Sequence, residues 1–322
     1  MKDNDIDNIF DDKKLQKSLK KAKLKSTLKI VVIAIFVFII GIILNFIIGI
    51  KYSQKAYEKN EAYIELSVPN GYISKSNDII GFLGGSGTYK ISKNLGNRAV
   101  ILEDRISLFG VIPPLNCSRI QGHSSSRGKE WSISLWENGY KKMRFFHPDL
   151  QYKKYQNDLE KLDNIPDGKI IEMGISFDRG YKIYEMYLVQ NAIKSAATTW
   201  LWLDEFTNQN MEEFKQEIDE YDSTSAGIEE SDIIGIECDE LSGFNNNQYN
   251  YSYDNLIDTL NKSCYIKHKD LYKEIMSRGK TKADDAKILG AVVYGTKDEL
   301  KKLIGNPIIK ASSFGVIVDD IY

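Results

Sequence analysis

The hydrophobic pattern of the chain is dominated by one uninterrupted apolar run, which begins at Ile30 and ends at Ile50. Its 21 residues carry no charge, and Asn45 is the only strongly polar side chain among them. At about 1.5 Å of rise per residue, a helix of this length is about 31 Å long and matches the ~30 Å hydrocarbon core of a bilayer. The run therefore predicts one transmembrane helix. A cleaved signal peptide is disfavoured, because its apolar region is shorter and a small-residue cleavage site follows it.

Charge predicts the orientation of this helix. The first 29 residues contain nine lysines and five acidic residues, and the whole chain has a net charge of −2. Lysines before the run are these: Lys2, Lys13, Lys14, Lys17, Lys20, Lys21, Lys23, Lys25 and Lys29. The positive-inside rule places residues 1–29 in the cytoplasm and residues 51–322 outside. The outer part is acidic, which argues against direct nucleic-acid binding because phosphate contacts require Lys and Arg.

The short inner segment has its own apolar pattern. Ile6, Ile9 and Phe10 share one face of a predicted helix, and Leu15 and Leu19 continue a stripe. A segment of 29 residues is too short to bury a core, so any cytoplasmic function is a binding function. Two interpretations stay open: a basic collar that sets topology and touches lipid, or a helix that docks its apolar stripe in a groove of a partner.

The first part of the outer region, residues 51–165, predicts mainly strands. Residues 62–68 alternate in the manner of a strand, and residues 98–112 predict another. Residues 131–146 predict a hairpin that turns at Asn138 and Gly139. The glycines at positions 81, 84, 85 and 87 predict a flexible turn, because they lack the spacing of a phosphate-binding loop. A helical pattern over residues 152–162 ends before Pro166.

The second part, residues 166–322, predicts alternating strands and helices. Strands are expected at 169–177, 198–206, 232–238, 288–293 and 308–318, and helices near 184–191, 211–221, 256–260 and 271–276. Trp200 and Trp202 fall on one face of their strand, opposite Leu201 and Leu203. A turn at Gly295 and a capping box from Thr296 to Glu299 introduce the last helix. We expect an α+β extracytoplasmic region, a mixed or antiparallel sheet with packed helices, behind a single N-terminal transmembrane helix.

The chain offers little for catalysis or metal binding. Its three histidines, His123, His147 and His268, are isolated, and it has neither a HExxH nor a GxSxG motif. We therefore expect no catalytic residue, metal site or cofactor. The three cysteines form at most one disulfide, and the sequence does not choose the pair among Cys117, Cys238 and Cys264.

Several segments, in order, resemble one known family. These are LQKSLKKAKLKSTLKIVVIAIFVFII, ELSVPNGYIS, EMGISFDRGY, TTWLWLD, the pair Gly243 and Phe244, and ILGAVVYGTKDELKKLIGNPIIKASSFGVIVD. They resemble the membrane-anchored sigma factor regulators of low-GC Gram-positive bacteria, which are anti-sigma factors with N-terminal and C-terminal regulator domains. The resemblance implies a non-enzymatic protein that holds an extracytoplasmic-function sigma factor at the membrane and releases it on an envelope signal. The inner segment lacks the His and Cys residues of the zinc-containing anti-sigma type.

The resulting hypothesis divides the chain into four parts: residues 1–29 (cytoplasmic), 30–50 (transmembrane), 51–165 (β-rich) and 166–322 (C-terminal regulator domain). The sigma factor binds the inner stripe, and further partners are other envelope proteins and an intramembrane protease. Gly41, Asn45 and Gly49 would loosen the span for such a protease. The alternatives are a membrane-tethered cell-wall enzyme, suggested by His123 beside three serines, and an envelope scaffold protein.

Overall fold

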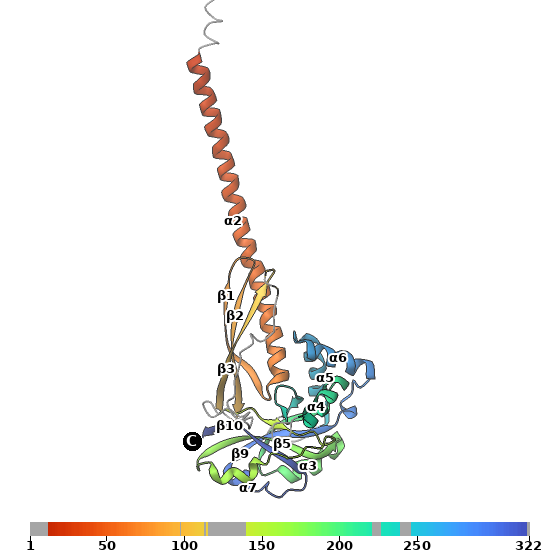
Figure 1. The fold of residues 1–322 in the computed structure, drawn as a ribbon. Coiled ribbons are helices and arrows are strands. Elements are labelled where there is room, and N and C mark those ends of the chain that lie inside the picture. Colours follow the sequence, from red (N-terminus) through yellow and green to blue (C-terminus); the bar gives the residue numbers. More distant parts are fainter. Residues whose placement is uncertain are drawn as a thin grey trace, which may run out of the picture.

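One long helix leads into a layered α+β body (Figure 1). The structure is a computed structural model, which describes residues 12–96, 98–112, 114, 140–220, 227–238 and 246–320. Helices and strands have these bounds: α2 Asp12–Ser67, β1 Gly71–Ile80, β2 Gly84–Leu95, β3 Arg98–Gly110, β4 Arg144–Phe145, β5 Lys169–Tyr181, α3 Met186–Ile193, β6 Ala197–Leu203, α4 Asn208–Glu220, β7 Ile228–Glu229, β8 Ile234–Glu237, α5 Asn246–Lys262, α6 Ile266–Arg278, β9 Ile288–Thr296, α7 Lys297–Lys301 and β10 Ile309–Asp319. Short 3-10 turns lie at Asp158–Asn164, Ile183–Glu185 and Ala283–Asp285.

Helix α2 contains the predicted span without interruption. It has 56 residues and is about 84 Å long at the usual rise of an α-helix. Among the described residues, it is the one helix long and apolar enough to cross a membrane. The chain therefore fits a single-pass membrane protein.

The far end of α2 corrects one prediction from the sequence. Residues 62–68 were expected to form a strand, but the helix continues to Ser67. Ala62, Ile64 and Leu66 are all buried there. Residues two apart lie about 200° apart around a helix, so both sides of α2 must be covered at this point. Helix α5 and the sheet of β1, β2 and β3 both pack against it, which makes a helix look like a strand in its burial pattern.

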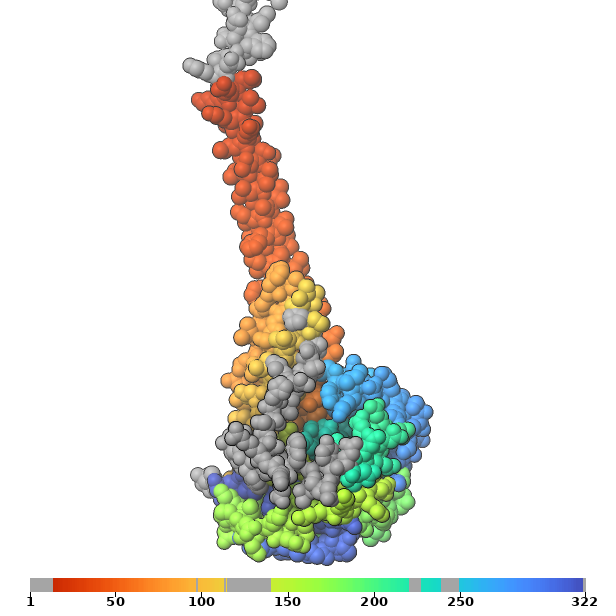
Figure 2. All heavy atoms as spheres, viewed as in Figure 1, coloured from red at the N-terminus to blue at the C-terminus, as the bar shows by residue number. Residues whose placement is uncertain are grey.

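The first sheet is a three-stranded antiparallel meander in the order β1-β2-β3. It lies along the second half of α2, and its β1–β2 turn points back toward the N-terminal half (Figure 1). Figure 2 shows that the helix projects from this sheet with no neighbour around its upper part. The predicted strand at 98–112 is confirmed as β3, whereas Gly84, Gly85 and Gly87 belong to β2 instead of a turn.

The second sheet is five-stranded and wholly antiparallel, in the order β10-β5-β9-β6-β8. Leu201 and Leu203 pack in the core on the side of α3, α5 and α6. Trp200 and Trp202 pack in a second core with Met143, Phe145 and the partly buried Phe214 of α4. The sequence prediction that these pairs face opposite sides is confirmed, and so is the α+β class.

Two local expectations were wrong. Gly295 does not turn the chain but pairs with Ile171 inside the sheet. A Cβ there would lie 3.1 Å from a carboxylate oxygen of Glu299, which folds back to cap α7, so the glycine makes room for the cap. The capping box between Thr296 and Glu299 is confirmed. The helical pattern at 152–162 yields only the 3-10 turn Asp158–Asn164. The predicted hairpin turn at Asn138 and Gly139 lies outside the described residues.

Candidate functional site

The inner end of α2 exposes the apolar side chains that the sequence singled out. Leu15 and Leu19 are each 56% exposed and lie four residues apart, on one face of the helix. Leu24 and Leu28, which the sequence reading did not name, are also exposed. Ile6, Ile9 and Phe10 lie outside the described residues. Within the described part of this segment, the apolar side chains have no packing partner in the chain and are free to meet another molecule.

The outer end of α2 is fixed by a buried histidine. Ser67, the last residue of the helix, has its Oγ 3.5 Å from Nε2 of His268 on α6. The other ring nitrogen, Nδ1, lies 2.9 Å from the hydroxyl oxygen of Ser263. Burial, together with the charges of Arg105 and Lys267, lowers the pKa of His268 to about 4. The ring is therefore neutral near neutral pH, as its enclosed position between two hydroxyls requires.

One turn earlier, Tyr63 joins three elements. Its ring meets Tyr265 edge-on at 5.4 Å between centroids, and the ring of His268 at 5.6 Å. The guanidinium carbon of Arg105, on β3, lies 3.9 Å from the centroid of the same ring. Arg105 also donates from Nε to Oδ1 of the buried Asn60, at 3.1 Å. Helix α2, the first sheet and α6 therefore meet around one aromatic side chain.

A buried ion pair joins the first sheet to the second. Lys93 of β2 and Glu172 of β5 are 0% and 1% exposed at their side chains, and Nζ lies 3.2 Å from both carboxylate oxygens. The amide of Val316 donates to Oε2 of Glu172 at 3.0 Å. Burial favours neutral Lys93, but the Glu172 charge outweighs it and raises the lysine pKa. The pair thus fixes the sheet that holds α2 onto the C-terminal body.

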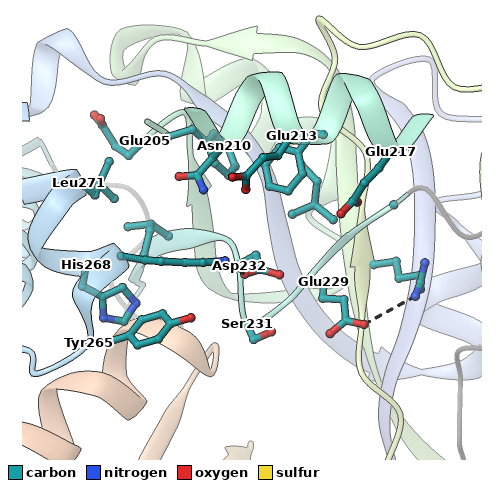
Figure 3. A pocket seen from close by; sticks show the side chains of 17 residues that line it. Glu205, Asn210, Glu213, Glu217, Glu229, Ser231, Asp232, Tyr265, His268 and Leu271 are labelled. Carbon is teal, nitrogen blue, oxygen red and sulfur yellow. Dashed lines mark ion pairs between the residues drawn. The ribbon is translucent and has the colours of Figure 1, made fainter. Parts of the chain in front are cut away.

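A pocket of about 260 Å³ opens beside the His268 junction (Figure 3). Helix α4 forms one wall with Glu213 and Glu217, and the loop after β7 supplies Ser231 and Asp232. The opposite wall comes from α6 and the residue before it, with His268 and Tyr265 as its labelled rings. These two rings also contact Tyr63, so one wall of the pocket touches α2 directly.

The pocket is acidic. Its lining holds five carboxylates and two cationic side chains: Glu205, Glu213, Glu217, Glu229 and Asp232 against Arg144 and Lys267. Burial raises the pKa of Glu217, and the charges of Asp232 and Glu213 raise it further. Arg144 lies 3.8 Å from Glu229. The electrostatics disfavour an anionic ligand, while the described residues contain no group of three or more His, Cys, Asp or Glu side chains arranged to hold a metal ion.

Comparison with known families decides the class of the protein. The model described as "Sigma factor regulator N-terminal" matches residues 16–100, and the model "Sigma factor regulator C-terminal" matches residues 162–316. The chain belongs to the sigma factor regulators. No curated protein and no solved structure matches it. The two matches lie in the order expected from the sequence and support an anti-sigma role.

The two family regions of this sigma factor regulator meet at the contacts described above. Ser67 and Lys93 lie in the N-terminal region, whereas His268 and Glu172 lie in the C-terminal region. Sequence reasoning missed both pairs. A lysine in a strand reads as a solvated residue, and an isolated histidine gives no periodic signal, so neither pair could be found without the three-dimensional arrangement.

The remaining histidine and the cysteines of the regulator have structural surroundings. Asp149 N–H donates to Nδ1 of His147, and its Nε2 lies 3.2 Å from Oδ1 of Asp204, so that ring is also held in the core. Cys264 is disulfide-bonded, and Cys238 is a free thiol. His123 and Cys117 lie outside the described residues, as do Gly243 and Phe244.

The span residues of the regulator have distinct neighbours. Asn45 makes two hydrogen bonds to the β1–β2 turn, and a Cβ added to Gly49 would collide with the side chain of Ile80. Gly41 has open space around the same position. Ile30 and Ile50 are both exposed on the helix surface. The sequence named all of these residues but gave no reason to expect that the first sheet reaches into the apolar run.

Proposed function

We propose that this protein is a single-pass anti-sigma factor that sequesters an extracytoplasmic-function sigma factor through residues 1–29 and responds to the envelope through its outer domain. The observation that carries the proposal is the single unbroken helix α2. It joins the exposed Leu15 and Leu19 at one end to the buried contact of Ser67 with His268 at the other. A continuous helix passes a shift or rotation from one end to the other without a hinge.

The orientation proposed is the one expected from the lysines, with the inner segment in the cytoplasm. The disulfide at Cys264 supports it, because disulfides persist in oxidising compartments and are rare in the cytosol. Cys264 lies far beyond the span in sequence, in the part that would then be outside. Protection of the C-terminal part from an external protease in intact cells would contradict this topology.

The proposed sigma-binding surface comprises Ile6, Ile9, Phe10, Leu15 and Leu19. The two leucines support it because they present an apolar stripe that no part of the described chain covers. An amphipathic helix that lays such a stripe in a groove is a recurrent mode of peptide recognition. The surrounding lysines would then set the approach to an acidic partner surface.

The test measures binding of the full chain, in detergent, to the sigma factor encoded beside its gene. Replacing Leu15 and Leu19 together by serine should weaken binding at least about tenfold, which corresponds to about 1.4 kcal/mol. Lys17→Gln is the matched control, because position 17 lies on the opposite face of the helix. Equal binding by all three proteins, with unchanged sigma-dependent transcription after gene deletion, would refute the proposal.

Release of the sigma factor is proposed to involve cleavage outside the membrane and then within the span. Gly41 supports a site of local loosening, because glycine disfavours the helix and has no neighbour in the described structure that would compensate. Gly41→Leu should slow intramembrane cleavage in cells while leaving the hydrogen bonds of Asn45 in place. Cleavage at the same rate, followed by immunoblotting of the inner fragment, would contradict this step.

A further inference from the structure

The β1–β2 turn lies against the apolar run of α2. Asn45 fastens it, because Nδ2 donates to the carbonyl of Gly81 at 2.9 Å and Oδ1 accepts from the amide of Leu83 at 2.7 Å. One helical turn further on, Gly49 packs against Ile80. Asn45 lies five residues before the end of the run, about 8 Å along the helix axis. The turn is therefore held at the depth of the span and does not lie beyond its end.

The side chains around this turn are apolar and exposed. Phe82 is 83% exposed and Ile79 is 72% exposed. Ile112, which follows β3, is 69% exposed. Val111 and Leu108 are exposed as well. Ile79 and Leu108 both lie opposite Ser86 in the sheet register, so they share one face. We call Ile79, Phe82, Leu108, Val111 and Ile112 the turn patch.

The polarity of β1 changes abruptly where it approaches the patch. Ser76, Asn77 and Asp78 are exposed and polar, whereas the next residue is Ile79. Ser53 of α2 donates a hydrogen bond to Asp78, so this boundary is joined to the helix. The helix has its own boundary close by, because the apolar run ends at Ile50 and the exposed Lys51 follows. Two segments distant in sequence thus change from polar to apolar at one level.

The backbone of the turn has hydrogen bonds of the kind that lipid demands. Gly81 N–H donates to the carbonyl of Gly84 at 2.7 Å, and the carbonyl of Leu83 accepts from Val111 at 2.8 Å. Asn45 satisfies the Gly81 carbonyl and the Leu83 amide. Irregular backbone is tolerated at membrane depth only when its polar groups find partners. The one polar side chain of the span supplies two of them.

We propose that the turn patch is embedded in the lipid bilayer beside the transmembrane helix, with acyl chains as its partner. The patch continues the apolar surface of the span, and the position of Asn45 places it about 8 Å inside the end of that surface. This agrees with the ~5–10 Å depth at which interfacial apolar segments are buried. Lys51 and Lys55 then lie at the level of the lipid headgroups. The inference rests on the membrane crossing in the proposed function, and it makes the bilayer a direct contact of the sheet that holds α2.

The test uses photo-crosslinking of the full chain in liposomes of phosphatidylethanolamine and phosphatidylglycerol. Benzoylphenylalanine replaces Phe82, and two matched variants carry it elsewhere. Phe38 is exposed within the span and serves as the lipid-facing control. Ser76 is exposed on the polar part of the same strand and serves as the aqueous control. All three positions are exposed, so the bulky residue fits without disturbing a core.

After illumination, lipid adducts are measured by mass spectrometry of the intact protein. The expected result is an adduct yield at position 82 close to that at position 38 and several-fold above that at position 76. A yield at 82 as low as at 76, with strong labelling at 38, overturns the proposal while the membrane anchor stands. A protein–protein adduct at 82 in place of lipid overturns it in favour of a second copy. No adduct at 38 means that the anchor itself has failed, and with it both proposals.

Discussion

The two ends of helix α2 are built from one continuous helix but have opposite surroundings. From Leu15 to Leu28 the apolar side chains are exposed, whereas from Ala56 to Ser67 the helix is buried on several sides. The inner end has no described partner in its own chain. The outer end contacts the first sheet and α5, and its last residue meets His268. The same helix therefore presents a free surface for capture at one end and a fixed joint at the other.

This difference teaches where a signal could be lost or passed. Substitutions at the fixed end should change the stability of the fold, and those at the free end should change only binding. The following predictions use matched pairs of residues to break that contrast or to sharpen it. Stability is measured in each case as the free energy of unfolding of the full chain in detergent micelles, followed by tryptophan fluorescence.

The largest effect is expected at the ion pair that fixes the first sheet. Lys93→Met leaves Glu172 as a buried carboxylate without its cation, which should cost about 3–5 kcal/mol. Adding Glu172→Gln removes the stranded charge and should restore part of the loss. The control is Lys21→Met at the exposed inner end, with a change within about 0.5 kcal/mol. Equal effects at positions 93 and 21 would show that the buried pair does not fix the sheet.

The second prediction compares two leucines of the same helix. Leu66 is 2% exposed and Leu19 is 56% exposed. Leu66→Ala should destabilise the fold by about 3 kcal/mol through lost burial and a cavity. Leu19→Ala should leave stability unchanged within about 0.5 kcal/mol and weaken sigma binding instead. Loss of stability at Leu19, or none at Leu66, would remove the distinction between the free and the fixed end.

The sequence predicted the free end of α2 better than the fixed end. A run without charges over residues 30–50 has one physical explanation, so the span could be read directly. Residues 62–68 were misread because a helix covered on both sides buries alternate residues, as a strand does. The pattern of burial alone cannot separate these cases when the segment is this short.

The strands and helices of the C-terminal sheet were mostly predicted, because Trp200, Trp202 and the capping box at Thr296 give local signals. The junction was not predicted. Lys93 and Glu172 are 79 residues apart, and Ser67 and His268 are 201 residues apart. Each contact depends on the packing of two sheets and a helix, which no local pattern in one sequence contains.

The third prediction concerns the pH dependence of the fixed end. The pKa of His268 falls from 6.5 to about 4 on folding, so the unfolded chain binds more protons in that window. Stability should therefore decrease as the pH falls below 6.5, by roughly 1.5 kcal/mol between pH 6.5 and pH 5. His268→Gln should lose this part of the pH dependence. Burial raises the pKa of Glu205 and Glu172, which has the opposite sign but is common to both proteins.

The comparison is made by measuring the free energy of unfolding of both proteins at several pH values. The difference between the two curves isolates His268, even when His268→Gln lowers stability at every pH. A difference that stays constant from pH 6.5 to pH 5 would mean that the ring is not held neutral at the end of α2. It would also remove the electrostatic reason for its position between Ser67 and Ser263.

The smallest effect is expected where the free and fixed parts of α2 meet, at the two glycines of the span. Alanine favours a helix over glycine by about 1 kcal/mol, so Gly41→Ala should stabilise the helix slightly and alter no contact. At Gly49 the new methyl group meets Cγ2 of Ile80, which is held close to its strand and cannot rotate away freely. Gly49→Ala should therefore push the β1–β2 turn from the helix and speed amide exchange at Leu83, whose N–H donates to Asn45. Hydrogen exchange of residues 79–85 measures this. Equal exchange in the two variants would mean that the sheet does not grip α2 as far as Gly49, and that the fixed part of the helix begins beyond the membrane.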